Sequence, residues 1–176
     1  MDHLMPIVLT GPESTGKSVL GRQLARHFKA HYIAEYARIY LSKNKGHYSC
    51  DSLLDLARSH RAFQQARLPG SGLVFLDTDL INYKVWFAVV CQTYPSYLRA
   101  KIKEEEEHRY LLTAPDIPWK PDPLRENPHN RAEIFRLHLQ EIETWRRPYA
   151  IIAGQGEQRF WAGVKAVKQW ITLAEQ

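Results

Sequence analysis

Residues 11–18 read Gly-Pro-Glu-Ser-Thr-Gly-Lys-Ser and fit the pattern G-x-x-x-x-G-K-[ST] without a mismatch. An apolar stretch, residues 6–10, precedes this octapeptide, and residues 16–29 follow it with apolar side chains at helical spacing. A strand, a glycine turn and a helix in this order are the context that distinguishes a phosphate-binding loop from an accidental match. By average residue usage, the pattern occurs by chance in about one per cent of chains of this length.

The chemistry of phosphate binding explains the spacing of the loop. Glycine lets the backbone curl so that consecutive N–H groups point at one anion, and the helix beginning at Gly16 directs its positive end at the same place. We predict that Lys17 reaches the β- and γ-phosphate oxygens of ATP and that the Ser18 hydroxyl binds Mg²⁺. The residues predicted to hold ATP are Gly11, Glu13, Ser14, Thr15, Gly16, Lys17, Ser18 and Val19.

Composition bounds the other possibilities. With 176 residues, 44% hydrophobic and 24% charged, the chain is typical of one globular domain, and no apolar run approaches the ~20 residues of a membrane span. The N-terminus has the pattern of neither a signal peptide nor a membrane anchor. Two cysteines, Cys50 and Cys91, are too few for a disulfide framework and too far apart for a metal clip, which favours a reducing cytoplasm.

The net charge of +5 has two interpretations. A basic surface can follow nucleic acid, or its arginines can serve a polyanionic small ligand such as ATP. Because no aromatic-plus-basic RNA motif or recognition helix is present, we favour a small phosphate-bearing ligand and expect no nucleic-acid partner.

Strands and helices are predicted to alternate along the chain. The predicted strands are 6–10, 32–34, 73–76, 109–113 and 149–153. The predicted helices are 16–29, 35–44, 52–67 with Asp51 as its cap, 79–93, 96–107, 130–145 and 157–174. This order predicts a three-layer α/β P-loop fold, with a parallel sheet of about five strands and helices on both faces. We expect one domain over residues 1–176.

Carboxylates stand at the ends of two predicted strands. The apolar strand 73–76 is followed by Asp77-Thr78-Asp79, and Glu35 follows the strand 32–34. A P-loop enzyme needs such an acid near Ser18 to hold Mg²⁺, and we assign Asp77 to that role. Asp79 and Glu35 are further candidates for orienting or deprotonating an acceptor hydroxyl. Asp79 could equally cap the next helix, and Glu35 could form a surface ion pair.

A proline-dense segment, residues 115–130, is predicted to form a lid. Its Arg125, together with the nearby Arg131, could stabilise the charge on a transferring phosphoryl group while closure excludes water. The alternative is a structured surface crossover with solvated arginines.

Aromatic side chains are candidates for stacking on a base. Tyr83 belongs to a stripe with Trp86 and Phe87 that is typical of a helix core, although its first turn lies near the acid pair. Tyr36 and Trp119 are similar candidates. His60 lies on an apolar stripe and is more typical of a core histidine than of a catalytic group.

The ordered set of motifs resembles the ribosylnicotinamide kinase domain of the bacterial NadR-type proteins. The set comprises the loop 11–18, Glu35-Tyr36-Ala37-Arg38, Asp77-Thr78-Asp79 and the segment 115–125, and it spans nearly the whole chain. The resemblance implies an adenylate-kinase-like sheet and the reaction ATP + nicotinamide riboside → ADP + nicotinamide mononucleotide. It differs at Pro123, where the family usually has glycine after the aspartate, and the chain is expected to carry no adenylyltransferase domain.

The resemblance implies that Glu35, Tyr36 and Arg38 lie near the acceptor and that Asp77 and Asp79 serve the metal and the ribose hydroxyls. Together with the aromatic candidates Tyr83 and Trp119 and the loop residue Ser18, this gives Glu35, Tyr36, Arg38, Asp79, Tyr83 and Trp119 as the expected acceptor residues and Asp77 and Ser18 as those expected at the metal. His60 also matches a histidine associated with the family. The catalytic set is then Lys17, Asp77, Asp79, Glu35, Arg125 and Arg131.

Other functions remain open from the sequence. The near alternative is a kinase for another nucleoside, and a different class is a nucleotide-dependent switch or a binding module without turnover. The absence of an Asn-Lys-x-Asp pattern disfavours a GTPase. Residues 154–156 could contact adenine or form an ordinary turn.

Overall fold

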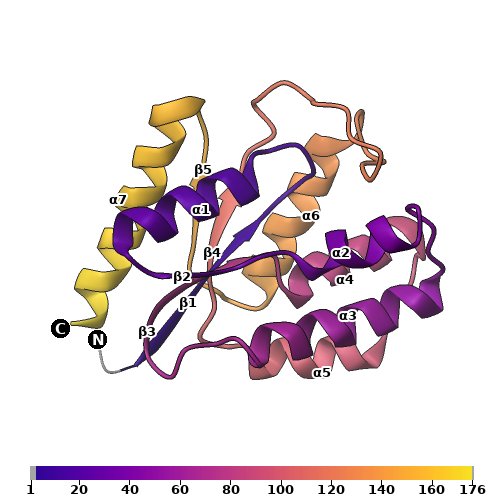
Figure 1. Cartoon of the computed structure of the whole chain (residues 1–176), viewed down its shortest axis with the longest axis horizontal. Helices are drawn as coiled ribbons and strands as arrows, with labels where there is room; N and C mark the ends of the chain where they lie inside the picture. The colour runs from indigo at the N-terminus through magenta and orange to yellow at the C-terminus, as the bar shows by residue number, and fades with distance from the viewer. Residues whose placement is uncertain (1–2, 176) are drawn as a thin grey trace.

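A five-stranded parallel sheet forms the centre of the molecule (Figure 1). The computed structural model describes residues 3–175. The strands are β1 (Leu4–Thr10), β2 (His31–Ile33), β3 (Gly72–Asp77), β4 (Arg109–Thr113) and β5 (Tyr149–Ile152). They lie in the order β2-β3-β1-β4-β5, and each neighbouring pair is parallel. The predicted three-layer α/β fold is therefore confirmed.

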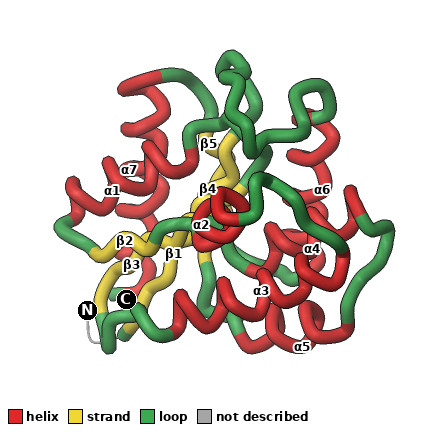
Figure 2. The backbone as a smooth tube through the Cα atoms, turned by 45° about the vertical axis from the view of Figure 1, so that its right-hand side comes forward, coloured by secondary structure: helices red, strands yellow, loops and turns green. Residues whose placement is uncertain are grey.

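Within residues 3–175, seven helices cover the two faces of the sheet (Figures 1 and 2). They are α1 (Lys17–Phe28), α2 (Tyr36–Lys43), α3 (Cys50–Gln65), α4 (Leu80–Val90), α5 (Ser96–Glu104), α6 (Arg131–Thr144) and α7 (Gly156–Ala174). Helices α1 and α7 pack on one face, and α3, α4, α5 and α6 pack on the other. No helix among residues 3–175 combines the length and apolarity needed to cross a membrane.

The central strand β1 explains why both faces must be covered. Ile7 and Leu9 belong to the core beneath α1 and α7, whereas Val8 belongs to the core beneath α3–α6, and all three are fully buried. A strand buried on both faces is a continuous apolar run, which is what residues 6–10 showed. The predicted cap of α3 was wrong by two residues, because Ser49 caps the helix through a reciprocal pair of hydrogen bonds with Ser52.

The strand register places the site at the carboxyl edge of the sheet. Leu9 pairs with Asp77, and the Thr78 amide donates a hydrogen bond to the Leu9 carbonyl at 3.0 Å. The end of β3 therefore lies beside the point where β1 enters the glycine-rich loop. In open α/β sheets, ligands bind at this edge, where the strand order reverses.

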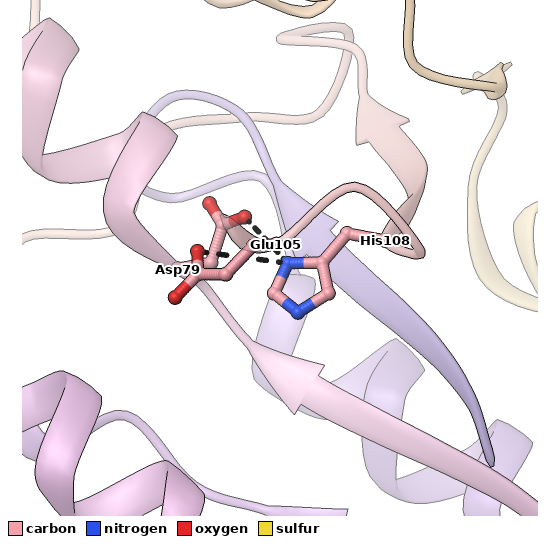
Figure 3. A group of neighbouring side chains, drawn as sticks. All are labelled: Asp79, Glu105 and His108. Carbon is pink, nitrogen blue, oxygen red and sulfur yellow. Dashed lines mark hydrogen bonds and ion pairs between the residues drawn. The ribbon is translucent and has the colours of Figure 1, made fainter. Parts of the chain in front are cut away.

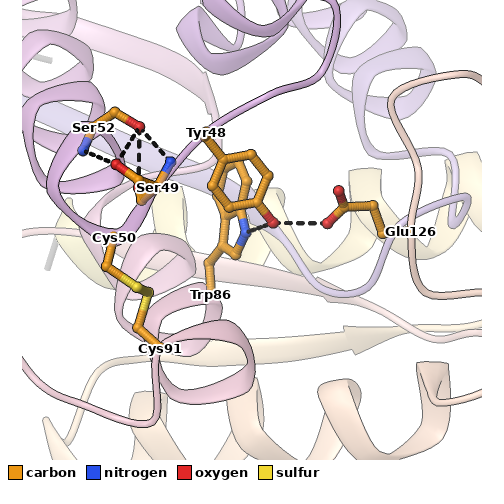
Figure 4. Close-up of a disulfide and its surroundings, with 7 residues drawn as sticks. All are labelled: Tyr48, Ser49, Cys50, Ser52, Trp86, Cys91 and Glu126. Carbon is orange, nitrogen blue, oxygen red and sulfur yellow. Dashed lines mark hydrogen bonds between the residues drawn. A yellow bond between two sulfur atoms is a disulfide. The ribbon is translucent and has the colours of Figure 1, made fainter.

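The two cysteines form a disulfide, which corrects the expectation from cysteine usage (Figure 4). Cys50 begins α3 and Cys91 follows α4, with a sequence separation of 41 and 6.0 Å between their Cα atoms. Packing of α3 against α4 brings the two residues together, and sequence spacing alone does not reveal that. Cysteine usage thus gives no argument for a reducing compartment.

Reducing this disulfide should destabilise the fold. In the chain-entropy model, a disulfide that closes a loop of this length lowers the conformational entropy of the unfolded chain and so stabilises the fold by about 4 kcal/mol. We expect the urea midpoint to fall when a dithiol reductant is added. The Cys50→Ser/Cys91→Ser double variant is the control, since its midpoint should match the reduced protein and ignore the reductant. An equal midpoint with and without reductant would contradict the prediction.

Candidate active site

The loop of residues 11–18 joins β1 to α1 and is shaped by two glycines. Gly16 caps α1 with a φ of 79°, and Gly11 has a φ of 124°. A Cβ atom at Gly11 would lie 2.8 Å from the Thr113 carbonyl oxygen, so the loop approaches β4 too closely for any side chain there. The first turn of α1 begins within the loop, at Lys17, so the free N–H groups of this turn face the loop.

Lys17 occupies the mouth of this loop. Its Nζ donates hydrogen bonds to the carbonyl oxygens of Gly11 at 2.8 Å and Pro12 at 2.7 Å. Burial lowers the pKa of Lys17, although the carboxylates of Glu35 and Asp77 oppose that shift. The ammonium group is thus held at the loop by backbone acceptors, with two acids nearby.

Asp77 ends β3 and faces the same space. Its Oδ2 accepts a hydrogen bond from the Tyr32 hydroxyl at 2.7 Å, and its Oδ1 is buried without a hydrogen-bond partner. Burial and the Asp77 charge raise the pKa of Tyr32, which keeps this hydroxyl a donor. An unpartnered carboxylate oxygen lining a cavity with the Ser18 hydroxyl is a hard-oxygen donor set, so these residues fit Mg²⁺.

Glu35 is the second acid in this space. It precedes α2 without capping it through its side chain. Burial, and then the nearby Asp77 charge, raise its pKa to about 7, while Lys17 and Arg38 oppose the shift. A carboxyl group with a pKa near neutrality can exchange a proton at physiological pH, so Glu35 is suited to acid–base work in this space.

The lid segment, residues 115–130, crosses over the glycine-rich loop. Arg125 donates to the Ser14 hydroxyl at 3.4 Å, and Arg131 donates to the Ser14 carbonyl at 3.4 Å and the Ile117 carbonyl at 3.0 Å. Both guanidinium groups lie within 6 Å of the Trp119 ring centroid. Trp119 therefore positions the two arginines rather than lining the cavity, which corrects its expected place at the acceptor.

The lid is docked on the loop through Glu13. Its Oε2 accepts hydrogen bonds from the backbone amides of Glu126 and Asn127, both at 3.1 Å. Arg38 of α2 forms an ion pair with Asp122 at 3.0 Å, so the lid also contacts α2. These contacts enclose a space between the loop and the lid.

A cavity of about 700 Å³ fills this space. This volume is within the range of pockets that bind small molecules and cofactors. The glycine-rich loop, α2, α4, α6 and the lid residues 122–127 all contribute to its lining. Among the predicted site residues it gathers Gly11, Glu13, Ser14, Thr15, Gly16, Lys17, Ser18, Val19, Glu35, Arg38, Asp77 and Arg125. Arg131 lies outside the lining and reaches the loop only through Ser14.

Asp79 is a correction, because it does not line this cavity. Its carboxylate is fully buried, caps α4 through the Ile81 amide at 3.0 Å, and accepts from Tyr110 at 2.5 Å. His108 contacts the same carboxylate at 3.1 Å (Figure 3). The structure therefore supports the alternative of a helix cap for Asp79.

Two aromatic candidates are corrected as well. Tyr83 of α4 is fully buried, and its ring centroid lies 5.1 Å from that of His60 and 5.9 Å from that of Trp86. Tyr36 packs against Phe63 at 5.2 Å. Both residues contribute to the core between α2, α3 and α4 and do not line the cavity. His60 is also fully buried there, and burial lowers its pKa to about 4.

Other residues of the site were missed by the sequence reasoning. Tyr48 and Trp86 line the cavity with their rings 5.0 Å apart, and the Tyr48 hydroxyl donates to Glu126 of the lid at 2.7 Å (Figure 4). Trp86 was recognised only as part of the helical stripe. Tyr48 follows a loop without any periodic signal, so no pattern could have found it.

Arg159 of α7 is a further residue that the sequence reasoning missed. Its guanidinium group is buried and donates to the carbonyls of Thr15 at 2.9 Å and Gly154 at 2.7 Å, and it pairs with Asp116. The Gly154 amide in turn donates to Asp116 at 2.6 Å. Residues 154–156 thus support the glycine-rich loop from behind and lie outside the cavity lining.

Comparisons with solved structures agree with this architecture. NadR protein in complex with NR has a TM-score of 0.74 at 22% identity, covering 94% of this chain and 51% of that one. NadR in complex with NAD and AMP-PNP has a TM-score of 0.73 at 22% identity, covering 94% and 49%. Deoxyadenosine kinase from M. mycoides with bound dATP has a TM-score of 0.55 at 9% identity, covering 93% and 99%. This chain spans about half the length of the NadR chains.

The expected likeness to the NadR-type kinase domain is thereby confirmed for the fold. A search among curated proteins found no match. A family model described as an AAA domain matches residues 6–159, which include the glycine-rich loop, most of β1, strands β2–β5 and helices α1–α6. The chain therefore belongs to the AAA domain family.

Proposed function

We propose that the chain is an ATP- and Mg²⁺-dependent kinase that phosphorylates nicotinamide riboside to nicotinamide mononucleotide. The observation that carries the proposal is the shared cavity, which Lys17, Asp77, Glu35 and Arg125 all line. A passive nucleotide-binding module needs no acid of raised pKa opposite its phosphate loop. The motif order and the fold shared with NadR support nicotinamide riboside as the acceptor.

The chain's residues divide the work of phosphoryl transfer. The loop amides and Lys17 hold the β- and γ-phosphates, and Ser18 and Asp77 would hold Mg²⁺, which neutralises charge on the transferring group. Glu35 accepts the proton of the acceptor hydroxyl as its oxygen forms the new bond to phosphorus and the bond to ADP breaks. Arg125 stabilises the charge on the phosphoryl oxygens, and the lid excludes water.

The acceptor side of the cavity suits a cationic ring. Nicotinamide riboside carries a positive charge on its pyridinium ring, and such rings favour aromatic faces and nearby carboxylates. Tyr48 and Trp86 offer aromatic surface there, and the Glu126 carboxylate accepts from Tyr48. This end of the cavity is the place for the base, and the end near Glu35 is the place for the ribose hydroxyl.

The function is tested by the release of ADP from ATP·Mg²⁺ with and without a panel of nucleosides. We expect strong stimulation by nicotinamide riboside, and Lys17→Ala should lower that rate at least about a hundredfold because phosphate charge loses its partner. Lys168→Ala, on the exposed side of α7, is the matched control and should leave the rate unchanged. Both variants should unfold at the wild-type temperature within a few degrees.

Three outcomes would contradict this assignment. Stimulation by thymidine or cytidine alone would make the chain another nucleoside kinase. Hydrolysis of ATP that no nucleoside changes would make it a nucleotide-dependent switch. Full activity in Lys17→Ala would remove the glycine-rich loop from catalysis.

The role of Glu35 predicts a pH dependence. A carboxyl group with a pKa of about 7 accepts a proton only when ionised, so kcat/KM for the acceptor should rise with pH up to about 7 and then level off. Glu35→Gln should lower the rate and abolish this limb of the profile. Glu133→Gln, on the exposed face of α6, should keep the wild-type profile. An unchanged limb in Glu35→Gln would exclude Glu35 as the base.

A further inference from the structure

A polar bridge joins α4 to α6 at the wall of the cavity. Oδ1 of Asn82, in the first turn of α4, lies 3.2 Å from Nε2 of His138 on α6. Both residues line the cavity together with Asp77, while the imidazole itself is almost fully buried. A neutral imidazole has one N–H group, so it cannot donate a hydrogen bond to oxygen atoms on both sides. This restricts the orientation of the Asn82 amide.

The backbone fixes the tautomer of His138. Its Nδ1 lies 2.8 Å from the Ile134 carbonyl oxygen, one turn earlier in α6. A carbonyl oxygen only accepts hydrogen bonds, so Nδ1 must carry the hydrogen. Burial, with the Lys17 charge as a smaller contribution, lowers the pKa of His138 to about 4, and the ring is neutral at neutral pH. Its Nε2 therefore presents a lone pair to Asn82.

The lone pair on Nε2 decides which end of the Asn82 amide faces His138. Only the NH₂ group of an amide can donate to that nitrogen, and a half-turn of the amide interchanges oxygen and nitrogen with little change of shape. In the described part of the chain, His138 is the sole hydrogen-bond partner of the Asn82 side chain. Once the NH₂ group is bound to His138, the amide oxygen is available to a ligand in the cavity.

We propose that Asn82 determines acceptor specificity by presenting its amide oxygen to a sugar hydroxyl of the bound nucleoside. A carbonyl oxygen repels phosphate oxygens, so at the phosphoryl-transfer end of the cavity its partner is a hydroxyl of the acceptor and not the triphosphate of ATP. Asn82 follows Asp77 by five residues and lines the same cavity, and its partner His138 experiences the Lys17 charge. It is therefore at the phosphoryl-transfer end of the cavity, where the sugar must lie, and the inference rests on the proposed function.

The tautomer can be measured without any activity. Long-range ¹H–¹⁵N spectra distinguish Nδ1–H from Nε2–H imidazoles, and the His138 signals are those lost in His138→Gln. We expect a neutral Nδ1–H ring at pH 7 that stays neutral down to about pH 5, given its pKa of about 4. An Nε2–H ring or an imidazolium at pH 7 would overturn the inference, because the amide oxygen would then face His138.

The specificity is measured with nucleoside analogues. We expect the wild type to favour nicotinamide riboside over its 2′-deoxy or 3′-deoxy analogue by about tenfold in kcat/KM, the value of one neutral hydrogen bond. In Asn82→Leu, which keeps the size of the side chain but lacks the oxygen, that preference should fall to about one, through the acceptor KM and not the ATP KM. His138→Phe should lose the same preference, and His138→Gln, which again offers an acceptor to the amide, should restore part of it.

The outcomes separate this inference from the proposed function. A wild type that phosphorylates nicotinamide riboside but keeps its hydroxyl preference in Asn82→Leu overturns the role of Asn82 alone. A preference lost only against an analogue without the carboxamide would place Asn82 at the base and overturn the sugar contact. A wild type that phosphorylates no nucleoside overturns the proposed function and the sugar contact with it. The Nδ1–H tautomer of His138 is tested separately by the spectra.

Discussion

The close approach of the glycine-rich loop to β4 is the constraint on which the site depends. The backbone at Gly11 lies so near the Thr113 carbonyl that only a residue without a Cβ fits. Beside it, the buried hydroxyls of Thr15 and Thr113 lie 2.6 Å apart, within reach of the carbonyls of Pro12 and Thr10. This contact fixes where the loop leaves the sheet, and thereby where Lys17 and the first amides of α1 can meet an anion.

Buried polar groups hold the rest of the site in place around this contact. Arg159 joins the loop to the end of β5 from behind, because its donors reach the carbonyls of Thr15 and Gly154. Tyr32 holds one oxygen of Asp77 and leaves the other unpartnered. Burying a polar group away from water costs free energy unless the group has a hydrogen-bond partner. The residues that supply these partners are therefore as constrained as those in the cavity.

The fold was predictable because its signals are local. Runs of apolar residues defined the strands, and the loop pattern between residues 6–10 and 16–29 defined the edge at which ligands bind. Asp77 could be found by the same reasoning, since it directly ends an apolar strand. Asp79 could not be separated from it, because the chain turns at Thr78 with a φ of 68° and directs the next carboxylate into the core. Because threonine rarely adopts this left-handed conformation, the sequence carries no signal of the turn.

Contacts between segments that are distant in sequence could not be predicted. Tyr48 and Trp86 are in contact at a sequence separation of 38, and the two cysteines at a separation of 41. Trp119 was expected to stack on a base, yet Arg125 of its own segment and Arg131 at the start of α6 lie against its ring. In each case the partner is chosen by tertiary packing, which spacing along the chain does not encode.

The docking of residues 126 and 127 on Glu13 has a consequence for how the lid would open under the proposed function. Because one carboxylate oxygen accepts both amides, a single displacement of the Glu13 side chain breaks both hydrogen bonds. Glu13 belongs to the loop that we propose binds ATP, so nucleotide binding and release of the lid would involve the same few atoms. Exchange of ADP for ATP would then be coupled to opening of the cavity for the acceptor.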